Sequence, residues 1–319
     1  MSFISRQDDS LVIKLCQIKI KIRIKNEKIS NIIFEDKKYI DAKCVNLPIV
    51  KSTKDTLMAL KNSNCSICRY GDGEFNLIFG ADIAFQPYSI ELADKLKTIL
   101  LSKDDNILIA IPDRFGQYDK NIKKDAIKYW RKYMINNRHK IYPLLDLHKT
   151  YYDSFISRPY IDMITDAKNI FNEIKELWEN KDIIIVEGKF SRLGYKNDLF
   201  SNTNSIERII CPEKNAYGIY SQILSECKKF PKDKLFIIAL GPTATILAYD
   251  LAKTGYRALD LGHIDIEYEW FLKKATKKIA VKNKYVNEAK NGKIKSDLSD
   301  ITYKKQICCN LTLKEEENA

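Results

Sequence analysis

The stretch LFIIALGPTATILAYDLAKTG, residues 235–255, predicts the fold most directly. LFIIAL (235–240) is a short, continuously apolar run, which is typical of a strand buried on both faces. Gly241 and Pro242 interrupt it, and TATILAYDLAKTG (243–255) then has the apolar spacing of a helix. RALDLG (257–262) follows as a second strand. Such a strand–helix–strand unit indicates a parallel sheet.

The same alternation recurs along the chain. Strands are predicted at CSICRY (65–70), ILIAIP (107–112) and DIIIVEG (182–188), and helices at 91–102, 120–135, 162–179 and 215–229. Buried strands separated by helices indicate an α/β fold, with a mostly parallel sheet and helices on both of its faces. We therefore predict one domain over residues 51–319, including a basic C-terminal tail.

Residues 1–50 differ from the rest of the chain. QIKIKIRIK (17–25) alternates apolar and basic residues, which is the pattern of a strand with one buried face. We predict a strand-rich extension that packs on the core.

The composition is that of a globular protein, with 45% hydrophobic and 30% charged residues. No apolar run is long enough for a transmembrane helix, and the start does not resemble a secretory signal, so a cytoplasmic protein is expected. The net charge of +12 comes from the two ends of the chain, since residues 51–270 carry 32 basic and 30 acidic residues. This distribution argues against a central nucleic-acid groove, although the basic ends could contact an anionic membrane at its inner face. A lysine-rich solvated surface explains the charge equally simply.

Cysteines are an alternative source of chemistry. Cys65 and Cys68 form a CxxC pair, but zinc would require two further ligands at a suitable spacing. Reduced, buried thiols are the simpler interpretation.

In open α/β sheets, ligands bind outside the carboxyl ends of the strands. RYGDGEFN (69–76) follows one predicted strand, and its glycines allow Asp72 and Glu74 to project from a tight turn. Two carboxylates so close together suit Mg²⁺ or Mn²⁺, which commonly bridge carboxylates to substrate phosphates. A plain surface loop remains the alternative.

Other strand ends offer groups for a phosphorylated ligand. Gly241, Pro242 and Thr243 open a helix, where free N–H groups could bind an anion or simply be capped. The loop after DIIIVEG contributes Ser191, Arg192, Asn197 and Asp198, of which Arg192 could clamp a phosphate. In CPEKNAY (211–217), Asn215 could be a helix cap or could contact a base.

LGHIDIEYEW (261–270) gathers a histidine and three carboxylates. If the strand continued, His263, Asp265 and Glu267 would share one face, which would supply a third metal ligand and a general base. A lone structural histidine is the alternative.

Three segments together resemble the GT-D type of glycosyltransferase, a family whose members occur in bacterial loci that glycosylate serine-rich adhesins and build surface polysaccharides. They are RYGDGEFNLIFG, VEGKFSRLGYKNDLF with IERIICPEKNAY, and ALGPTATILAYDLAKTGYRALDLGHIDIEYEWF, and the resemblance extends over about residues 52–310.

The resemblance implies a Rossmann-like fold that binds a UDP-sugar and a divalent metal, Mn²⁺ or Mg²⁺. Asp72 and Glu74 would be the Asp-x-Glu metal element, and His263 would complete it. Uridine diphosphate would be held by three loops: Ser191 to Asp198; Cys211, Pro212, Asn215 and Ala216; and Gly241 to Thr243.

The expected reaction transfers a sugar, a hexose, from the nucleotide to a glycan or glycoprotein acceptor. The metal, with Arg69 or Arg192, would stabilise the leaving diphosphate, and Asp265 or Glu267 would accept the proton of the acceptor hydroxyl. Two alternatives are a different nucleotide-dependent phosphate-ester enzyme and a noncatalytic basic binding module.

Overall fold

The structure is a computed structural model that describes residues 2–7, 10–15, 18–23, 47–115, 121–294 and 296–312. Its central feature is a nine-stranded sheet in the order β12-β9-β8-β10-β11-β5-β6-β7-β4. Every neighbouring pair in this sheet is parallel. The strands are β4 (Ile49–Val50), β5 (Ser66–Arg69), β6 (Ile107–Ile111), β7 (Thr150–Asp153), β8 (Asp182–Gly188), β9 (Ser205–Cys211), β10 (Leu235–Ala239), β11 (Arg257–Asp260) and β12 (Ile307–Asn310).

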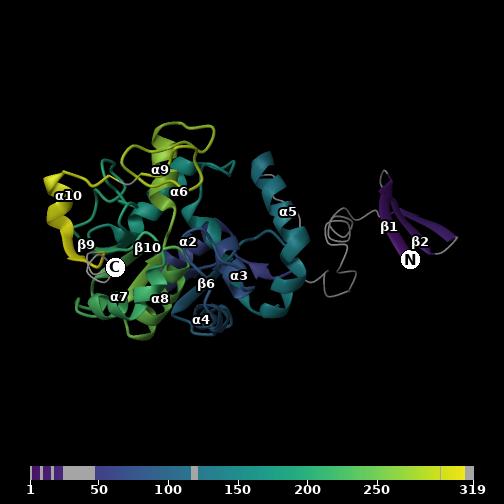
Figure 1. Cartoon of the computed structure of the whole chain (residues 1–319), viewed down its shortest axis with the longest axis horizontal. Helices are drawn as coiled ribbons and strands as arrows, with labels where there is room; N and C mark the ends of the chain where they lie inside the picture. Colours follow the sequence, from purple (N-terminus) through teal and green to yellow (C-terminus); the bar gives the residue numbers. More distant parts are fainter. Residues whose placement is uncertain are drawn as a thin grey trace.

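Helices cover both faces of the sheet, so the predicted α/β architecture is confirmed (Figure 1). The first face carries α3 (Asp72–Ile78), α4 (Ile90–Leu100), α5 (Lys124–Ile141), α7 (Tyr220–Cys227) and α8 (Pro242–Lys253). The second carries α2 (Thr53–Asn62), α6 (Ala167–Lys175) and α9 (Ile264–Leu272), and α10 (Ile301–Gln306) precedes β12. Short 3-10 turns lie at Tyr142–Leu144, Ser154–Ser157, Glu176–Trp178 and Ala216–Ile219.

The central strands consist mainly of apolar residues because both of their faces are buried. In β8, Ile184 and Val186 contribute to the core under α7 and α8, whereas Ile183 and Ile185 contribute to the core under α2, α6 and α9. All four side chains are inaccessible to solvent. Burial of each stabilises the fold by about 1.5–3 kcal/mol before the entropy of ordering is counted, which explains why such strands read as unbroken apolar runs.

The predicted helices and strands lie close to the observed ones, but four strands of the sheet were missed. β4, β7, β9 and β12 are short or mix polar and apolar residues, as in SIERIIC of β9. β12 belongs to the C-terminal tail and pairs with β9 at the edge of the sheet. The tail is therefore part of the core sheet at this strand.

The N-terminal strands form a sheet of their own. β1 (Ser2–Gln7), β2 (Ser10–Leu15) and β3 (Ile18–Arg23) are antiparallel, and none of them pairs with the nine-stranded sheet. The strand expected from the alternation in 17–25 corresponds to β3. Ile49 and Val50, at the end of the predicted extension, form β4 of the nine-stranded sheet, whereas the packing of the preceding residues on the core stays a prediction. In the described part of the chain, no helix has the length and apolarity needed to cross a membrane.

Candidate active site

A cavity of about 740 Å³ lies across the carboxyl ends of the strands. Its walls come from the segments that follow β5, β6, β7, β8, β9, β10 and β11, and from residues 276–278 and 285–288 in the C-terminal part of the chain. From β8 the chain continues to β9 on one side, and from β10 it continues to β11 on the other. Neighbouring strands whose connections diverge in this way create the crevice in which α/β sheets bind ligands.

Asp72 and Glu74 both line this cavity, but they project from the first turn of α3 and not from a tight turn. The expected turn was wrong because the carboxylates favour a helix start, where they oppose the helix dipole. The Tyr129 hydroxyl donates to the Asp72 carboxylate. The Glu74 carboxylate accepts the Gly71 N–H at 2.6 Å, which caps its own helix. Burial and then the nearby charge of Asp260 raise the pKa of Glu74 to about 7.

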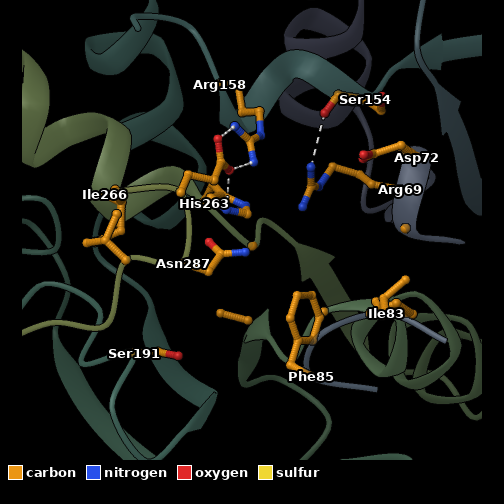
Figure 2. Close-up of a pocket in the computed structure, with 18 of the residues that line it drawn as sticks. Arg69, Asp72, Ile83, Phe85, Ser154, Arg158, Ser191, His263, Ile266 and Asn287 are labelled. Atoms are coloured by element: carbon orange, nitrogen blue, oxygen red, sulfur yellow. Dashed lines mark hydrogen bonds and ion pairs between the residues drawn. The ribbon is translucent and has the colours of Figure 1, made fainter. Parts of the chain in front are cut away.

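Arg69 lies at the end of β5 and lines the cavity beside this helix. Its Nε donates to the Asp260 carbonyl at 2.6 Å, and its guanidinium pairs with the Asp260 carboxylate at 3.1 Å. A third bond, of 3.1 Å, reaches the Ser154 carbonyl from Nη1 (Figure 2). The guanidinium is thus fixed between the ends of three strands, where it can face a negatively charged ligand.

His263 also lines the cavity, but it is not on a strand. β11 ends at Asp260, His263 is the residue that precedes α9, and Asp265 and Glu267 lie in the first turn of that helix. The prediction that these three residues share one strand face was therefore wrong. The His263 Nε2 bonds to Glu288 Oε1 at 3.0 Å. Burial, followed by the positive charge of Arg158, lowers the pKa of His263.

The two predicted bases are both engaged by the protein. Asp265 touches the cavity but accepts the Gly194 N–H at 2.8 Å and pairs with the buried Lys284 at 2.7 Å. Glu267 is completely buried and lies outside the lining of the cavity. Its Oε2 accepts the N–H groups of Tyr160 and Ile161 at 3.0 and 2.8 Å. These contacts favour structural roles, and no general base is assigned to either residue.

Glu267 gives the stability of the protein a specific pH dependence. Burial raises the pKa of Glu267 to about 7, from 4.5. The folded state then binds the proton more tightly than the unfolded state, so the stabilising contribution is present below pH 4.5 and is lost as the pH rises through 7. We expect wild type to lose about 2 kcal/mol relative to Glu267→Gln between pH 5 and 8, measured by urea denaturation. A constant difference between the two proteins would contradict this.

The predicted nucleotide-binding residues separate into three groups. Ser191, Pro212, Ala216, Gly241 and Pro242 line the cavity. Gly241, which follows β10, has φ +54°, and a Cβ atom there would lie 2.4 Å from the Phe85 ring. Only glycine therefore allows the backbone to pass this close to the ring. Figure 2 shows Phe85 and Ser191 in the wall of the cavity, away from Asp72 and Arg69.

The second group lies behind the wall. Cys211, Asn215 and Thr243 are outside the lining. Two of these three contact Gln86, whose Nε2 donates to Asn215 Oδ1 at 2.9 Å and whose Oε1 accepts the Thr243 hydroxyl at 3.4 Å. Gln86 is buried and joins three cavity loops. Sequence reasoning missed it because nothing in AFQPY marks a glutamine as a connection between distant loops.

Three more predicted residues also face the protein. Arg192 donates to the carbonyl groups of Asn283 and Ser296 at 2.7 and 2.5 Å. Asn197 Nδ2 donates to Asp265 at 2.8 Å, and Asp198 accepts from Lys175 at 2.9 Å. None of the three predicted residues lines the cavity. The loop expected to clamp a phosphate instead holds the C-terminal segment in place.

The described residues contain no group of three or more His, Cys, Asp or Glu side chains arranged to hold a metal. Asp72, Glu74 and His263 therefore do not form a three-ligand centre, and the same finding offers no support for a zinc site at Cys65 and Cys68. Asp72 and Glu74 still fit a more open site, because Mg²⁺ and Mn²⁺ often take only one or two carboxylates and complete their shell with water and substrate phosphates.

Comparison with known proteins identifies the family. The family model described as "Glycosyltransferase GT-D fold" matches residues 67–289. "Probable glycosyl transferase Gly" of Streptococcus gordonii is 38% identical over 267 residues, which are 82% of this chain and 39% of the relative. "Glycosyltransferase GlyD" of Streptococcus pneumoniae serotype 4 is 37% identical over 261 residues, 81% of this chain and 32% of the relative. The chain thus spans well under half the length of these curated relatives.

Two solved structures agree with this match. One, described as a highly conserved domain of unknown function with a distinct glycosyltransferase fold, has a TM-score of 0.79 and 37% identity, covering 84% of this chain and 97% of that one. A glycosyltransferase from Streptococcus sanguinis has a TM-score of 0.78 and 36% identity, covering 83% and 100%. By its sequence, its parallel sheet and the position of its cavity, the chain belongs to the GT-D glycosyltransferase family.

Proposed function

We propose that the protein transfers a hexose from a UDP-sugar to a hydroxyl of a glycan or glycoprotein acceptor, with Mn²⁺ or Mg²⁺. Family membership supports a glycosyltransferase, and such enzymes use a nucleotide-sugar donor. The cavity at the divergence of β8 and β10 has the size and place expected for such a donor.

The charge of the cavity is the observation that carries the proposed metal dependence. Among the described residues its lining contains eight carboxylates but only five Lys or Arg side chains. A diphosphate is itself an anion, so it would enter against a net negative lining. A divalent cation between the diphosphate and Asp72 would remove this repulsion.

Residues at the two ends of the cavity would have different roles in binding the donor. Phe85 lies in the cavity wall away from the polar groups and could contact the base, while Arg69 and Asp72 lie at the polar end. When the sugar–phosphate bond breaks, the electron pair stays with the diphosphate, the acceptor oxygen bonds to the anomeric carbon, and the proton of the acceptor hydroxyl passes to water. Arg69 would stabilise the charge that develops on the leaving oxygen, and the bound metal would supply further positive charge there.

The test is a panel of UDP-sugars, incubated with the protein and Mn²⁺, in which UDP release is measured with and without glycan acceptors and after addition of EDTA. We expect release that depends on one sugar and is abolished by EDTA. Turnover of the nucleotide without any need for a sugar would instead indicate a different phosphate-ester enzyme. No binding or turnover with any donor, metal or acceptor would remove the basis of the proposal.

A further inference from the structure

Five charged or titratable side chains form a connected cluster in the cavity wall, and Glu288 is at its centre. The Arg158 guanidinium contacts both Glu288 oxygens, at 3.4 Å through Nη1 and more closely through Nη2. Lys278 pairs with Glu288 and lies 3.2 Å from Asp162, and His263 bonds to Glu288 from a third direction. All five residues line the cavity. Figure 2 shows Arg158 and His263 on the same side of it as Arg69.

This arrangement has the geometry of an anion site that is already filled. The planar guanidinium group binds carboxylates and phosphates through the same pair of parallel N–H bonds. Here the two oxygens of Glu288 take that fork, and the ammonium of Lys278 adds a second cation to the same carboxylate. Although burial acts to raise it, the hydrogen bond from His263 and the charge of Arg158 hold the pKa of Glu288 well below its usual range. Glu288 is therefore an anion at neutral pH.

We propose that Arg158 and Lys278 are a phosphate-binding subsite for the donor, and that Glu288 occupies this subsite until the diphosphate displaces it. The inference rests on the proposed function, because it takes the cavity to receive a nucleoside diphosphate. It adds two binding cations and a competing internal carboxylate to that site.

The position of Glu288 in the chain allows it to leave. Residues 273–300, between α9 and α10, contain no helix or strand in their described part. This segment is anchored four residues before Glu288, where Lys284 is buried against Asp265 and Glu269. The N–H of Tyr285 also donates to the Phe190 carbonyl at 2.8 Å. Val286 is buried and its N–H donates to the Gly292 carbonyl at 2.8 Å, so Glu288 would turn away from Arg158 by rotation of its side chain while the backbone stays in place.

The experiment is calorimetric titration of Glu288→Gln with UDP and Mg²⁺, and separately with pyrophosphate alone. Removal of the competing charge should tighten the binding of both ligands. The affinity should rise by about tenfold if the binding free energy becomes more favourable by about 1.4 kcal/mol. A purely structural Glu288 predicts the opposite sign, since its loss would loosen the cavity wall and weaken binding. Glu179→Gln is the matched control, because Glu179 is an exposed carboxylate outside the lining of the cavity. It should change affinity less than twofold.

A double-mutant cycle locates the effect. Arg158→Ala should weaken UDP binding, and the gain from Glu288→Gln should disappear in the Arg158→Ala background, because the freed fork is what binds the ligand. Unchanged or weaker binding by a folded Glu288→Gln protein, or a gain that persists without Arg158, would overturn the inference. If Glu288→Gln does not fold, Glu288→Asp should still bind more tightly than wild type, because its shorter side chain contacts Arg158 less closely.

Pyrophosphate separates this inference from the proposed function, since it has neither base nor sugar. Tighter pyrophosphate binding by Glu288→Gln would support the subsite even if no UDP-sugar were a substrate. Unchanged pyrophosphate binding would reject the subsite even if transfer from a UDP-sugar were observed.

Discussion

Replacement of Asp72 by asparagine is expected to lower kcat/KM for the UDP-sugar by about 100-fold or more, with little change in the melting temperature. The substitution keeps the size of the side chain and an oxygen that can accept the Tyr129 hydroxyl, but it removes the negative charge. If Asp72 holds the metal against the diphosphate, the loss of its charge weakens metal binding. This effect arises only in the complex that contains both nucleotide and metal. The folded protein loses one favourable interaction with a helix dipole, worth about 0.5 kcal/mol.

The measurement is initial-rate UDP release at several Mn²⁺ concentrations, supported by electron paramagnetic resonance of Mn²⁺ bound in the presence of UDP. Asp125→Asn is the matched control, because Asp125 is an exposed carboxylate on α5 that also lines the cavity. It should keep at least half of the wild-type rate. Equal losses in the two variants, or Mn²⁺ binding that Asp72→Asn leaves unchanged, would show that Asp72 does not hold the metal.

The largest expected loss of stability follows from Lys284→Met. The Lys284 ammonium is 1% exposed and lies 2.7 Å from Asp265 and 3.0 Å from Glu269. Methionine fills a similar volume but leaves the Asp265 carboxylate buried without its cation. Breaking a buried ion pair from one side costs about 3–5 kcal/mol, because the remaining charge is neither solvated nor neutralised.

Lys282→Met is the control, since Lys282 is an exposed lysine two residues earlier in the same segment. We expect urea denaturation to show a loss of about 3–5 kcal/mol for Lys284→Met and less than about 0.5 kcal/mol for Lys282→Met. Lys284→Met should also lose transfer activity, because Lys284 anchors the segment that brings residues 285–288 to the cavity. Similar unfolding free energies for the two variants would contradict the role given to Lys284.

The sequence determined the class of the fold and the edge of the sheet at which the site lies. LFIIAL is apolar at every position and DIIIVEG is apolar from Ile183 to Val186, because β10 and β8 are covered on both faces, and the sequence pattern alone reveals this. The carboxyl ends of such strands must meet at one edge, so Asp72, Ser191, Gly241 and His263 could be expected near one another. All four line the cavity.

Only the tertiary structure decided which of these side chains face a ligand. Arg192, Asn197 and Glu267 have the same chemistry as residues of the cavity, yet each is turned into the protein by a partner far away in the chain. Conversely, Arg158 and Glu288 reach the cavity from segments 130 residues apart, and neither was predicted from the sequence to be a site residue. Hydrophobic burial can be recognised in the sequence from a local pattern of apolar residues. The direction of a polar side chain, in contrast, depends on partners that only the folded chain brings within hydrogen-bonding distance.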